Sequence, residues 1–475
     1  MFHLDAGSKT PLYQQIYAQV KEGILSGLTP EGTKLPSIRA LAEEIRAGRN
    51  TVESAYAQLV LEGYVTSVPK AGFVVNPVQY PMHPVTNSPL KEQHDSVSGN
   101  ERCQQEIVYD FHYGNLDASA FPYATWHKIQ SEVMKEARKG TSYSEGMHTY
   151  GEANGDLALR RELAGYLYRS RGVRCVPEQV VICSGLQPSI IAILRLLKNE
   201  CEVVALEDPT YTGAKVVYSC FDCPTVAIPV NQDGIDLNIL AASSANLVHI
   251  APSHQFPTGA VLPIGKRMEM LAWAESNGSW IIEDDYDSEL RYNGRPIPSL
   301  QSIDRQGRVI YMGTFSKALS PGIRMSYMVL PAQLAAAFKA VFAGFQCTVP
   351  WLEQAVLASF MAEGHWDRHL RKVCLIKKKR RDVFVGTAIR IFGDRIRIHG
   401  HNAGLHLLLE VPGGNGENDL VAKAAEYGVR VYPASPFWTD KKRCPKNCLF
   451  IGYGMLPERD IIAALERLRQ AWPLV

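Results

Sequence analysis

The sequence lacks the segments that carry a protein into or across a membrane. No uninterrupted run of about 18 apolar residues is present, so we predict no membrane-spanning helix. The first ten residues, MFHLDAGSKT, have no cationic start followed by an apolar run, so we expect no signal peptide. Both absences predict a cytoplasmic protein.

Cysteine is also sparse. Ten cysteines in 475 residues do not make a disulfide framework. Two pairs have short spacings, Cys220 with Cys223 and Cys444 with Cys448, and four thiolates are a common set of zinc ligands. Neither pair has a nearby histidine or a glycine-rich knuckle. We therefore favour reduced cysteines packed as small apolar side chains, and we expect no metal site.

The chain has little net charge. Its formal charge is +2, so any binding to nucleic acid has to come from a local patch and not from a basic coat. Apolar residues make up 46% of the sequence and charged residues 21%, a globular balance that can bury a large core. At roughly 100–200 residues per domain, the length predicts about two to four domains.

Composition divides the chain into three parts. Residues 1–75, hereafter the head, carry short helical patterns separated by turn signals. Residues 76–106 contain Pro77, Pro81, Pro84 and Pro89, many polar residues and no apolar period. Such a segment buries too little surface to fold alone, so we predict a flexible linker. Residues 107–475, hereafter the body, alternate helical stretches with short apolar strands.

The head shows three helical patterns followed by a hairpin pattern. Apolar spacing predicts a first helix over 11–25, a second through Leu41 that begins near Pro36, and a third that begins near Arg49 and ends at Gly63. Residues 64–68 and 72–75 alternate like two strands of a hairpin. This order is that of a winged helix-turn-helix, in which a helix after a short turn fits the major groove. On the third helix we expect Val52, Ala55, Leu59 and Val60 on one apolar face.

The head resembles the GntR family of bacterial regulators. The resemblance rests on Lys34-Leu-Pro-Ser-Ile-Arg-Ala-Leu-Ala, Arg49-Asn-Thr-Val, Ala55-Tyr and Leu61-Glu-Gly-Tyr, and it departs from the family at Gly48, where a serine is usual. It implies double-stranded operator DNA as a partner. Composition alone does not predict this, because the head has seven Lys or Arg and seven Asp or Glu. The implied DNA contacts, to phosphate or to base edges, are Ser37, Arg39, Arg49, Asn50 and Thr51, with Lys70 and Gly72 in the hairpin.

The sequence pattern of the body predicts an α/β fold with a mostly parallel sheet. Its apolar strands, expected at 180–183, 203–206, 247–251, 280–283 and 309–312, alternate with helical stretches. One strand runs into Asp284 and Tyr286, which lie two residues apart and therefore point to the same side of an extended chain. Another runs toward Lys317 among small and hydroxyl residues, where an amine can form a Schiff base.

These strings resemble fold-type I aminotransferases, and more closely the MocR group of GntR regulators, in which an aminotransferase-like domain follows the winged helix. The resemblance covers nearly the whole chain. It implies pyridoxal 5′-phosphate (PLP) as cofactor and a small C-terminal α+β part beside the large sheet. It rests on Glu207-Asp-Pro-Thr-Tyr211, Pro252-Ser-His-Gln-Phe-Pro-Thr-Gly259, Glu283-Asp-Asp-Tyr286, Thr314-Phe-Ser-Lys317 and Arg324.

The resemblance also implies a role for each residue. Lys317 would hold PLP as a Schiff base, and Asp284 would keep the pyridine nitrogen protonated. Tyr286 would hydrogen-bond the phenolic oxygen, and Tyr211 would stack on the ring. The phosphate would be held by the side chains of Arg324 and Thr314 and by the backbone at Gly185, Leu186 and Gln187, which open a helix after a strand.

The sequence leaves the signal open. Aminotransferases of this fold commonly bind a substrate carboxylate with an arginine in the small domain, and amino-acid-responsive relatives tend to place one just past the stacking tyrosine. Here Gly213 lies near that second position, and Arg430 is the nearest candidate for the first. We therefore favour a sensor of PLP, as in the PdxR-type members that control vitamin B6 synthesis. The alternatives are a sensor of an amino acid or an amine such as γ-aminobutyrate, and a working aminotransferase with an accessory head. Because fold-type I pockets usually sit at a dimer interface, we expect a homodimer.

Overall fold

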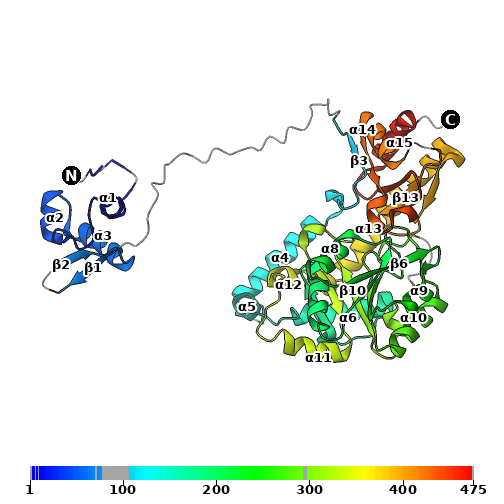
Figure 1. The fold of residues 1–475 in the computed structure, drawn as a ribbon, viewed down its shortest axis with the longest axis horizontal. Helices are drawn as coiled ribbons and strands as arrows, with labels where there is room; N and C mark the ends of the chain where they lie inside the picture. Colours follow the sequence, from blue (N-terminus) through cyan, green and yellow to red (C-terminus); the bar gives the residue numbers. More distant parts are fainter. Residues whose placement is uncertain are drawn as a thin grey trace. The chain divides into compact units, whose positions relative to one another are not determined.

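The computed structural model describes residues 3–5, 7–8, 10–69, 72–77, 106–140, 142–292, 297–413 and 416–472. The chain divides into two compact units, Met1–Arg102 and Cys103–Val475 (Figure 1). Residues 78–105 of the predicted linker lie outside the described residues, and so does Lys70. Within the described ranges, no helix is long and apolar enough to cross a membrane.

The head consists of three helices and a hairpin, in the predicted order. They are α1 (Leu12–Leu25), α2 (Ile38–Glu44), α3 (Arg49–Leu61), β1 (Val65–Val68) and β2 (Gly72–Val75). The two strands are antiparallel, with Val65 opposite Val75. The helices bury one apolar stripe each, and the core contains Ile16, Val20, Ile24, Leu41, Val52, Ala55, Tyr56 and Leu59.

Two details of the head differ from the prediction. Pro36 does not begin α2, because Ser37 is its N-cap and accepts a hydrogen bond from the Ala40 amide at 3.1 Å. Val60 is not on the buried face of α3: it is 36% exposed, whereas Tyr56 is buried. The buried positions follow the i, i+3, i+4, i+7 stripe that starts at Val52, and position 60 lies at the edge of that stripe.

The body is built on an eight-stranded sheet in the order β4-β11-β10-β9-β8-β5-β6-β7. Five neighbouring strands, β10, β9, β8, β5 and β6, pair in parallel, and β11 and β7 pair antiparallel with their neighbours. All five predicted strands are present, which confirms the α/β class. The strands are β4 (Val180–Cys183), β5 (Val204–Asp208), β6 (Thr225–Asn231), β7 (Gly234–Ile235), β8 (Leu247–Ile250), β9 (Trp280–Asp284), β10 (Val309–Thr314) and β11 (Ser326–Val329).

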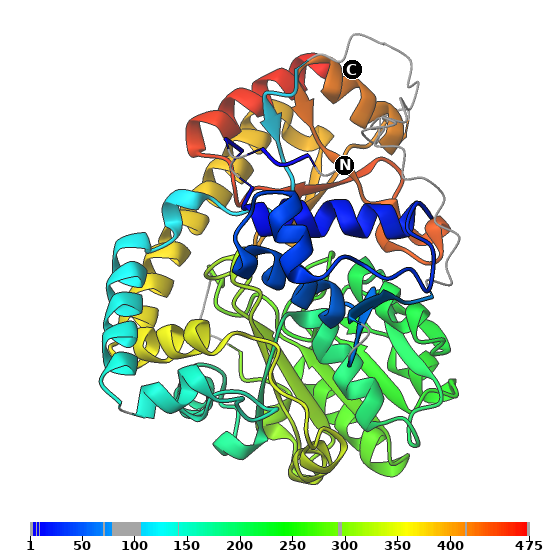
Figure 2. The same ribbon diagram turned by 90° about the vertical axis from the view of Figure 1, so that its left-hand side faces the viewer.

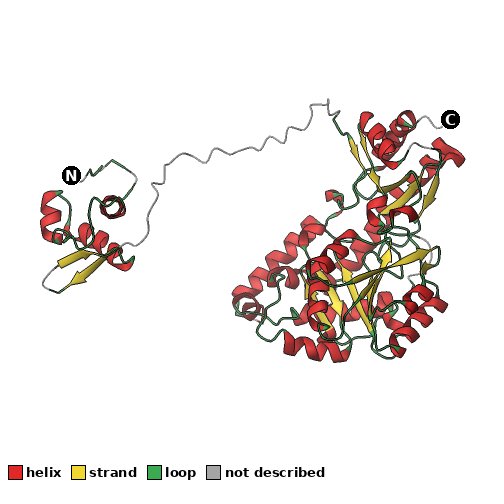
Figure 3. Cartoon of the chain, viewed as in Figure 1, coloured by secondary structure: helices red, strands yellow, loops and turns green. Residues whose placement is uncertain are grey.

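Helices cover both faces of this sheet (Figure 3), which is why its central strands are mostly apolar. Successive side chains of β10 point to opposite faces of the sheet: Ile310 and Met312 belong to one apolar cluster, and Tyr311 belongs to another. The helices of this part are α4 (Tyr123–Arg138), α5 (Ser142–His148), α6 (Leu157–Arg171), α7 (Leu186–Leu196), α8 (Thr212–Cys220), α9 (Leu237–Ala242), α10 (Ile264–Ser276), α11 (Ala332–Val341) and α12 (Trp351–Ala362).

A smaller C-terminal part follows the long helix α13 (His365–Phe392) and lies at one end of the body (Figures 1 and 2). Its antiparallel sheet has the order β12-β13-β16-β15. Strand β3 (Tyr109–Asp110) pairs with β14 (Val429–Arg430), so the chain that enters the body is held against this part. Its other elements are β12 (Arg397–His399), β13 (His406–Glu410), α14 (Glu417–Glu426), β15 (Tyr432–Pro433), β16 (Cys448–Gly452) and α15 (Glu458–Ala471).

Candidate functional site

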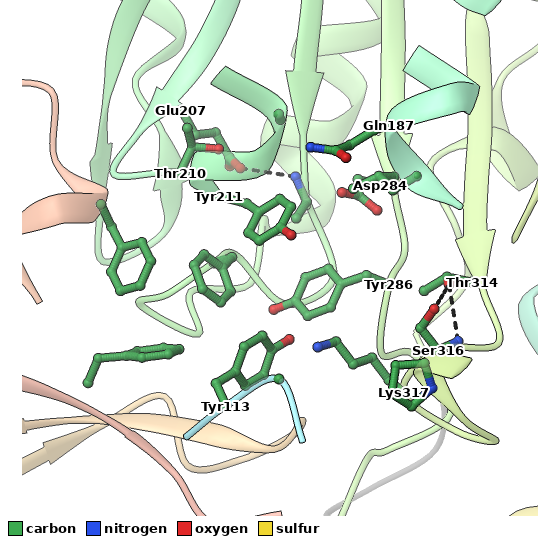
Figure 4. A pocket seen from close by; sticks show the side chains of 18 of the residues that line it. Tyr113, Gln187, Glu207, Thr210, Tyr211, Asp284, Tyr286, Thr314, Ser316 and Lys317 are labelled. Carbon is green, nitrogen blue, oxygen red and sulfur yellow. Dashed lines mark hydrogen bonds between the residues drawn. The ribbon is translucent and has the colours of Figure 1, made fainter. Parts of the chain in front are cut away.

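A cavity of about 650 Å³ opens at the carboxyl ends of the parallel strands, where ligands of open α/β sheets bind. Residues at or just beyond the ends of β5, β8, β9 and β10 line it. The structure brings eight of the nine predicted cofactor residues to its wall. Figure 4 labels six of them, Gln187, Tyr211, Asp284, Tyr286, Thr314 and Lys317, and the other two are Leu186 and Arg324. Gly185, the ninth, lies directly behind Arg324.

Lys317 extends into the cavity toward Tyr113 (Figure 4). Its Nζ atom lies 3.7 Å from the centroid of the Tyr113 ring. Burial lowers the pKa of Lys317 to about 8, although the charge of Asp287 opposes this. An uncharged amine is therefore accessible near neutral pH, and this is the form that attacks an aldehyde.

Asp284 lines the same cavity, and one oxygen of its carboxylate has no partner in the described part of the chain. Its Oδ1 atom is buried and has no hydrogen-bond partner among the described residues. Its Oδ2 atom lies 3.5 Å from His249 Nε2, and His249 Nδ1 lies 3.0 Å from the Tyr218 hydroxyl. A buried carboxylate oxygen needs a donor. The protonated pyridine nitrogen of PLP is such a donor, so the residues at this end of the cavity fit the cofactor.

A candidate anion site lies where α7 begins. Its N-cap, Gly185, has φ +119°, and a Cβ atom there would overlap the guanidinium of Arg324. Arg324 is exposed, and its hydrogen bonds are weak ones to the carbonyls of Pro321 and Ser184 at 3.4 Å. A guanidinium beside free helix amides favours a phosphate.

Thr314 and Ser316 form one hydroxyl pair at this end of the cavity. The Thr314 hydroxyl donates to Ser316 Oγ at 3.0 Å and accepts a bond from the Ser316 amide at 3.1 Å. Both side chains line the cavity (Figure 4). Ser316 is therefore a second candidate donor for an anion.

The ring of Tyr211 leaves no room for a side chain at position 213. Tyr211 is the N-cap of α8, and its side chain is 39% exposed at the cavity. A Cβ atom on Gly213 would overlap the Tyr211 ring. An arginine at position 213 is therefore incompatible with this position of the tyrosine.

One wall of the cavity is aromatic, formed by Phe256 from the loop after β8 and by Phe437 and Phe450 from the C-terminal part. The ring centroids of Phe256, Phe437 and Phe450 lie 4.8–5.4 Å apart. Arg430 does not line the cavity: it is 3.5 Å from Asp110 Oδ2 on the neighbouring strand. Among the described residues that line the cavity, Lys317 and Arg324 are the only lysine and arginine. Once Arg324 binds a phosphate, no guanidinium is left for a carboxylate.

The sequence pattern missed several residues of this site. His249 could have been found, since it is a polar residue inside the apolar strand Leu247–Ile250. Glu207, whose pKa is raised to about 8 by burial, accepts a bond from the Ala251 amide and also follows an apolar run. Tyr113 gave no local signal, because its place depends on the pairing of β3 with β14.

The predicted DNA contacts on the helices lie at the N-terminal ends of α2 and α3. Ser37 caps α2, and Arg49, Asn50 and Thr51 form the first turn of α3. Ser37, Arg49 and Asn50 are exposed and Thr51 is half-buried. Exposed Arg39 pairs with Glu43 at 3.0 Å. Gly48 caps α3 without a side-chain hydrogen bond, as its departure from the family predicts. In the hairpin, Gly72 has φ +92°.

The four cysteines with short spacings show no ligand set. Cys220 and Cys223 lie at the end of α8, and Cys448 begins β16. Over the described part of the chain, no group of three or more His, Cys, Asp or Glu side chains is arranged to hold a metal ion.

Two family models match the chain: bacterial regulatory proteins of the gntR family over residues 12–75, and aminotransferases of class I and II over 112–468. The HTH-type transcriptional regulator YdeL of Bacillus subtilis is 37% identical over 98% of this chain and 97% of its own. The probable rhizopine catabolism regulatory protein MocR of Rhizobium meliloti is 32% identical over 99% of this chain and 96% of its own. The chain belongs to the MocR subfamily of GntR regulators.

Two further similarities bear on this MocR-type regulator. The pyridoxine biosynthesis regulator PdxR of Corynebacterium glutamicum is 28% identical over 92% of this chain and 90% of its own. The α-aminoadipate aminotransferase LysN of Thermus thermophilus is 26% identical with a TM-score of 0.66, over 76% of this chain and 91% of its own, and its structure contains N-(5′-phosphopyridoxyl)-L-leucine. The expected family and fold are thus confirmed, and PLP is the cofactor of the family to which the body belongs.

Proposed function

We propose that this chain is a PLP-dependent transcription regulator whose head binds operator DNA and whose body holds PLP on Lys317. One observation carries the proposal. Lys317, the carboxylate of Asp284 and the guanidinium of Arg324 line a single cavity. These groups match the aldehyde, the ring nitrogen and the phosphate of PLP.

Each residue contributes a separate property to the pocket. Burial makes the uncharged amine of Lys317 accessible. Burial also raises the pKa of Tyr286 well above its ordinary value, so its hydroxyl remains a donor. Asp284 supplies a negative charge at the far end, and Arg324 a positive one at α7. When bound, PLP supplies an aldehyde that condenses with amines and an electron-poor ring.

We further propose that PLP is itself the signal and that the chain controls genes of vitamin B6 synthesis. The support is the aromatic wall of Phe256, Phe437 and Phe450: among the described residues that line the cavity, Arg324 is the only arginine, and it is assigned to the phosphate. A carboxylate buried there without a cationic partner would be strongly disfavoured. The similarity to PdxR, whose name refers to pyridoxine biosynthesis, agrees with this proposal.

A second candidate is a sensor of an amine that lacks a carboxylate. The same wall favours it, because aromatic rings lining a cavity of about 650 Å³ suit an apolar or cationic body. Under this candidate the amine, and not PLP, changes operator binding. We do not expect turnover of an amino acid with a keto acid, which would identify a working aminotransferase.

Anisotropy titrations of operator DNA distinguish these candidates. The full chain is titrated without PLP, with PLP, and with PLP plus an alkylamine that has no carboxylate. A parallel titration with γ-aminobutyrate, which does carry a carboxylate, tests the carboxylate-bearing alternative. We expect PLP alone to change operator affinity, because a ligand shifts an equilibrium only if it binds the two states differently. An unchanged affinity with PLP and a changed one with an amine would replace the first candidate by the second.

The head gives a direct test of DNA binding. Replacing Arg49 with alanine removes an exposed guanidinium from the first turn of α3. If Arg49 contacts phosphate, operator affinity should fall for all sequences and the salt slope should decrease by about one. If it contacts guanine, the loss should be about 1–3 kcal/mol at one base pair. Arg138→Ala, at an exposed arginine of the body, is the control. Unchanged affinity and slope in Arg49→Ala would refute this role of α3.

We also propose a homodimer that carries two heads on the segments 76–106 and therefore binds a bipartite operator. Light scattering of the PLP-loaded chain at micromolar concentration should give twice the mass of one chain, which is 52.7 kDa. A monomer with full PLP occupancy would contradict the proposal.

A further inference from the structure

His254 and Asp287 form a buried pair that none of the roles above uses. His254 lies in the loop after β8, and Asp287 lies in the loop after β9. His254 Nδ1 is 2.7 Å from Asp287 Oδ2, and the two side chains are 5% and 4% exposed. Burial acts to lower the pKa of His254, but the Asp287 carboxylate outweighs it, and the pKa is raised. The pair is thus a charge-assisted hydrogen bond shielded from water.

The C-terminal part closes over this pair with backbone atoms. The Gly400 carbonyl lies 3.5 Å from His254 Nε2. Gly404 has φ +73°, and a Cβ atom there would lie 2.6 Å from His254 Cε1 and would overlap the Asp287 carboxylate. Beside them a Cβ atom on Gly259 would overlap Gly400. The pair therefore lies in a closely packed seam between the loops of the large sheet and the β12–β13 connection.

On its other side the pair reaches the cofactor cavity through Tyr286. The Tyr286 hydroxyl donates to the His254 carbonyl at 3.1 Å and lies 3.2 Å from His254 Nδ1. The Tyr286 ring lines the cavity beside Lys317 (Figure 4). A phenol has one hydrogen, so Tyr286 cannot donate to a ligand in the cavity and to the His254 carbonyl at the same time. A ligand that accepts this hydrogen must release the bond to the His254 loop.

We propose that Tyr286, His254 and Asp287 form a positioning unit that couples occupation of the cavity to the C-terminal part. The proposal rests on the proposed function, because it takes PLP as the ligand that accepts the Tyr286 hydrogen. The change at the His254 carbonyl passes to the imidazole, which Asp287 holds against Gly400 and Gly404. Without the imidazole, the cavity still binds PLP, but PLP binding no longer shifts the contact between the large-sheet loops and the β12–β13 connection.

The test compares three variants of the full chain. His254→Phe removes the ring nitrogens and keeps the bulk, and Asp287→Asn keeps an acceptor but removes the charge. His406→Phe is the matched control, because His406 is also fully buried and its ring lies 5.3 Å from that of His254. Two quantities are measured, the visible absorption of bound PLP and the ratio of operator affinities with and without PLP.

The wild type and His406→Phe should show the same ratio, roughly 5- to 150-fold for an allosteric coupling. In His254→Phe, PLP should still attach to Lys317, its visible band should shift, and the ratio should fall to about one. Asp287→Asn should lie between them, and its ratio decides the question if His254→Phe does not fold. If folded His254→Phe keeps the visible PLP band of the wild type and the wild-type ratio of operator affinities, the inference is overturned while the proposed function stands. A ratio of one in the wild type would instead overturn the proposed function, and the inference with it.

Discussion

Replacing Lys317 with alanine should abolish the covalent attachment of PLP. The wild-type chain should be yellow when loaded, and borohydride should fix the cofactor to the peptide that contains Lys317. The reason is that Lys317 is the lysine that lines the cavity, with its pKa lowered to about 8 by burial. In Lys317→Ala the reducible bond should be lost, and PLP should leave on dialysis.

A second buried lysine provides an internal control for this experiment. Burial also lowers the pKa of Lys377 to about 8, but Lys377 donates to the Gly454 carbonyl at 2.6 Å and does not line the cavity. Peptide mapping after borohydride should therefore find label on Lys317 and none on Lys377. Retention of a reducible bond in Lys317→Ala, or label on Lys377, would show that a lysine other than Lys317 forms the bond with PLP.

Removing the guanidinium of Arg324 should weaken PLP binding by one to two orders of magnitude. A hydrogen bond to a charged group contributes about 1.5–3 kcal/mol, roughly 10- to 150-fold in Kd. Gly185→Ala should have a similar effect, because its Cβ atom would displace Arg324 and the φ of +119° is strained for alanine. The loss is measured by titrating PLP against the visible absorption of the chain.

The losses of PLP affinity caused by Arg324→Ala and Gly185→Ala should not be additive. If both act by removing the guanidinium from the phosphate, the double variant should bind PLP about as weakly as Arg324→Ala alone. Gly386→Ala is the matched control, since a Cβ atom at this helical position meets no atom within 4 Å. Full additivity, or tight binding in Arg324→Ala, would place the phosphate elsewhere.

The helices and hairpin of the head and five strands of the body could be predicted from local pattern. Strands β4, β5, β8, β9 and β10 were recognisable as apolar runs, whereas β6 was not predicted. Three of the predicted strands, β5, β9 and β10, extend one or two residues further than predicted, to Asp208, Asp284 and Thr314. These polar residues are still part of the strands while their side chains lie at the carboxyl edge. A prediction from hydrophobicity alone therefore ends a strand too early where its last residues are polar site residues. It also cannot show that β11 inserts antiparallel between β4 and β10.

The site could be predicted only where its residues share a strand end or a motif. Asp284 and Tyr286 lie two residues apart, and Lys317 follows the next strand of the sheet. The contact between His254 and Asp287 depends on the pairing of β8 with β9, and their contact with Gly404 depends on the packing of the C-terminal part. Neither is encoded in local spacing. The aromatic wall likewise joins Phe256 to Phe437 and Phe450 across long sequence separations.

The linkage between cofactor and operator is the central claim, and one titration tests it most directly. PLP affinity of the full chain is measured from its visible absorption, first alone and then with saturating operator DNA. Binding free energies are reciprocal, so operator must change PLP affinity by the same factor by which PLP changes operator affinity. We predict a factor of roughly 5 or more, consistent with a coupling of about 1–3 kcal/mol. An identical PLP affinity with and without operator would contradict the account.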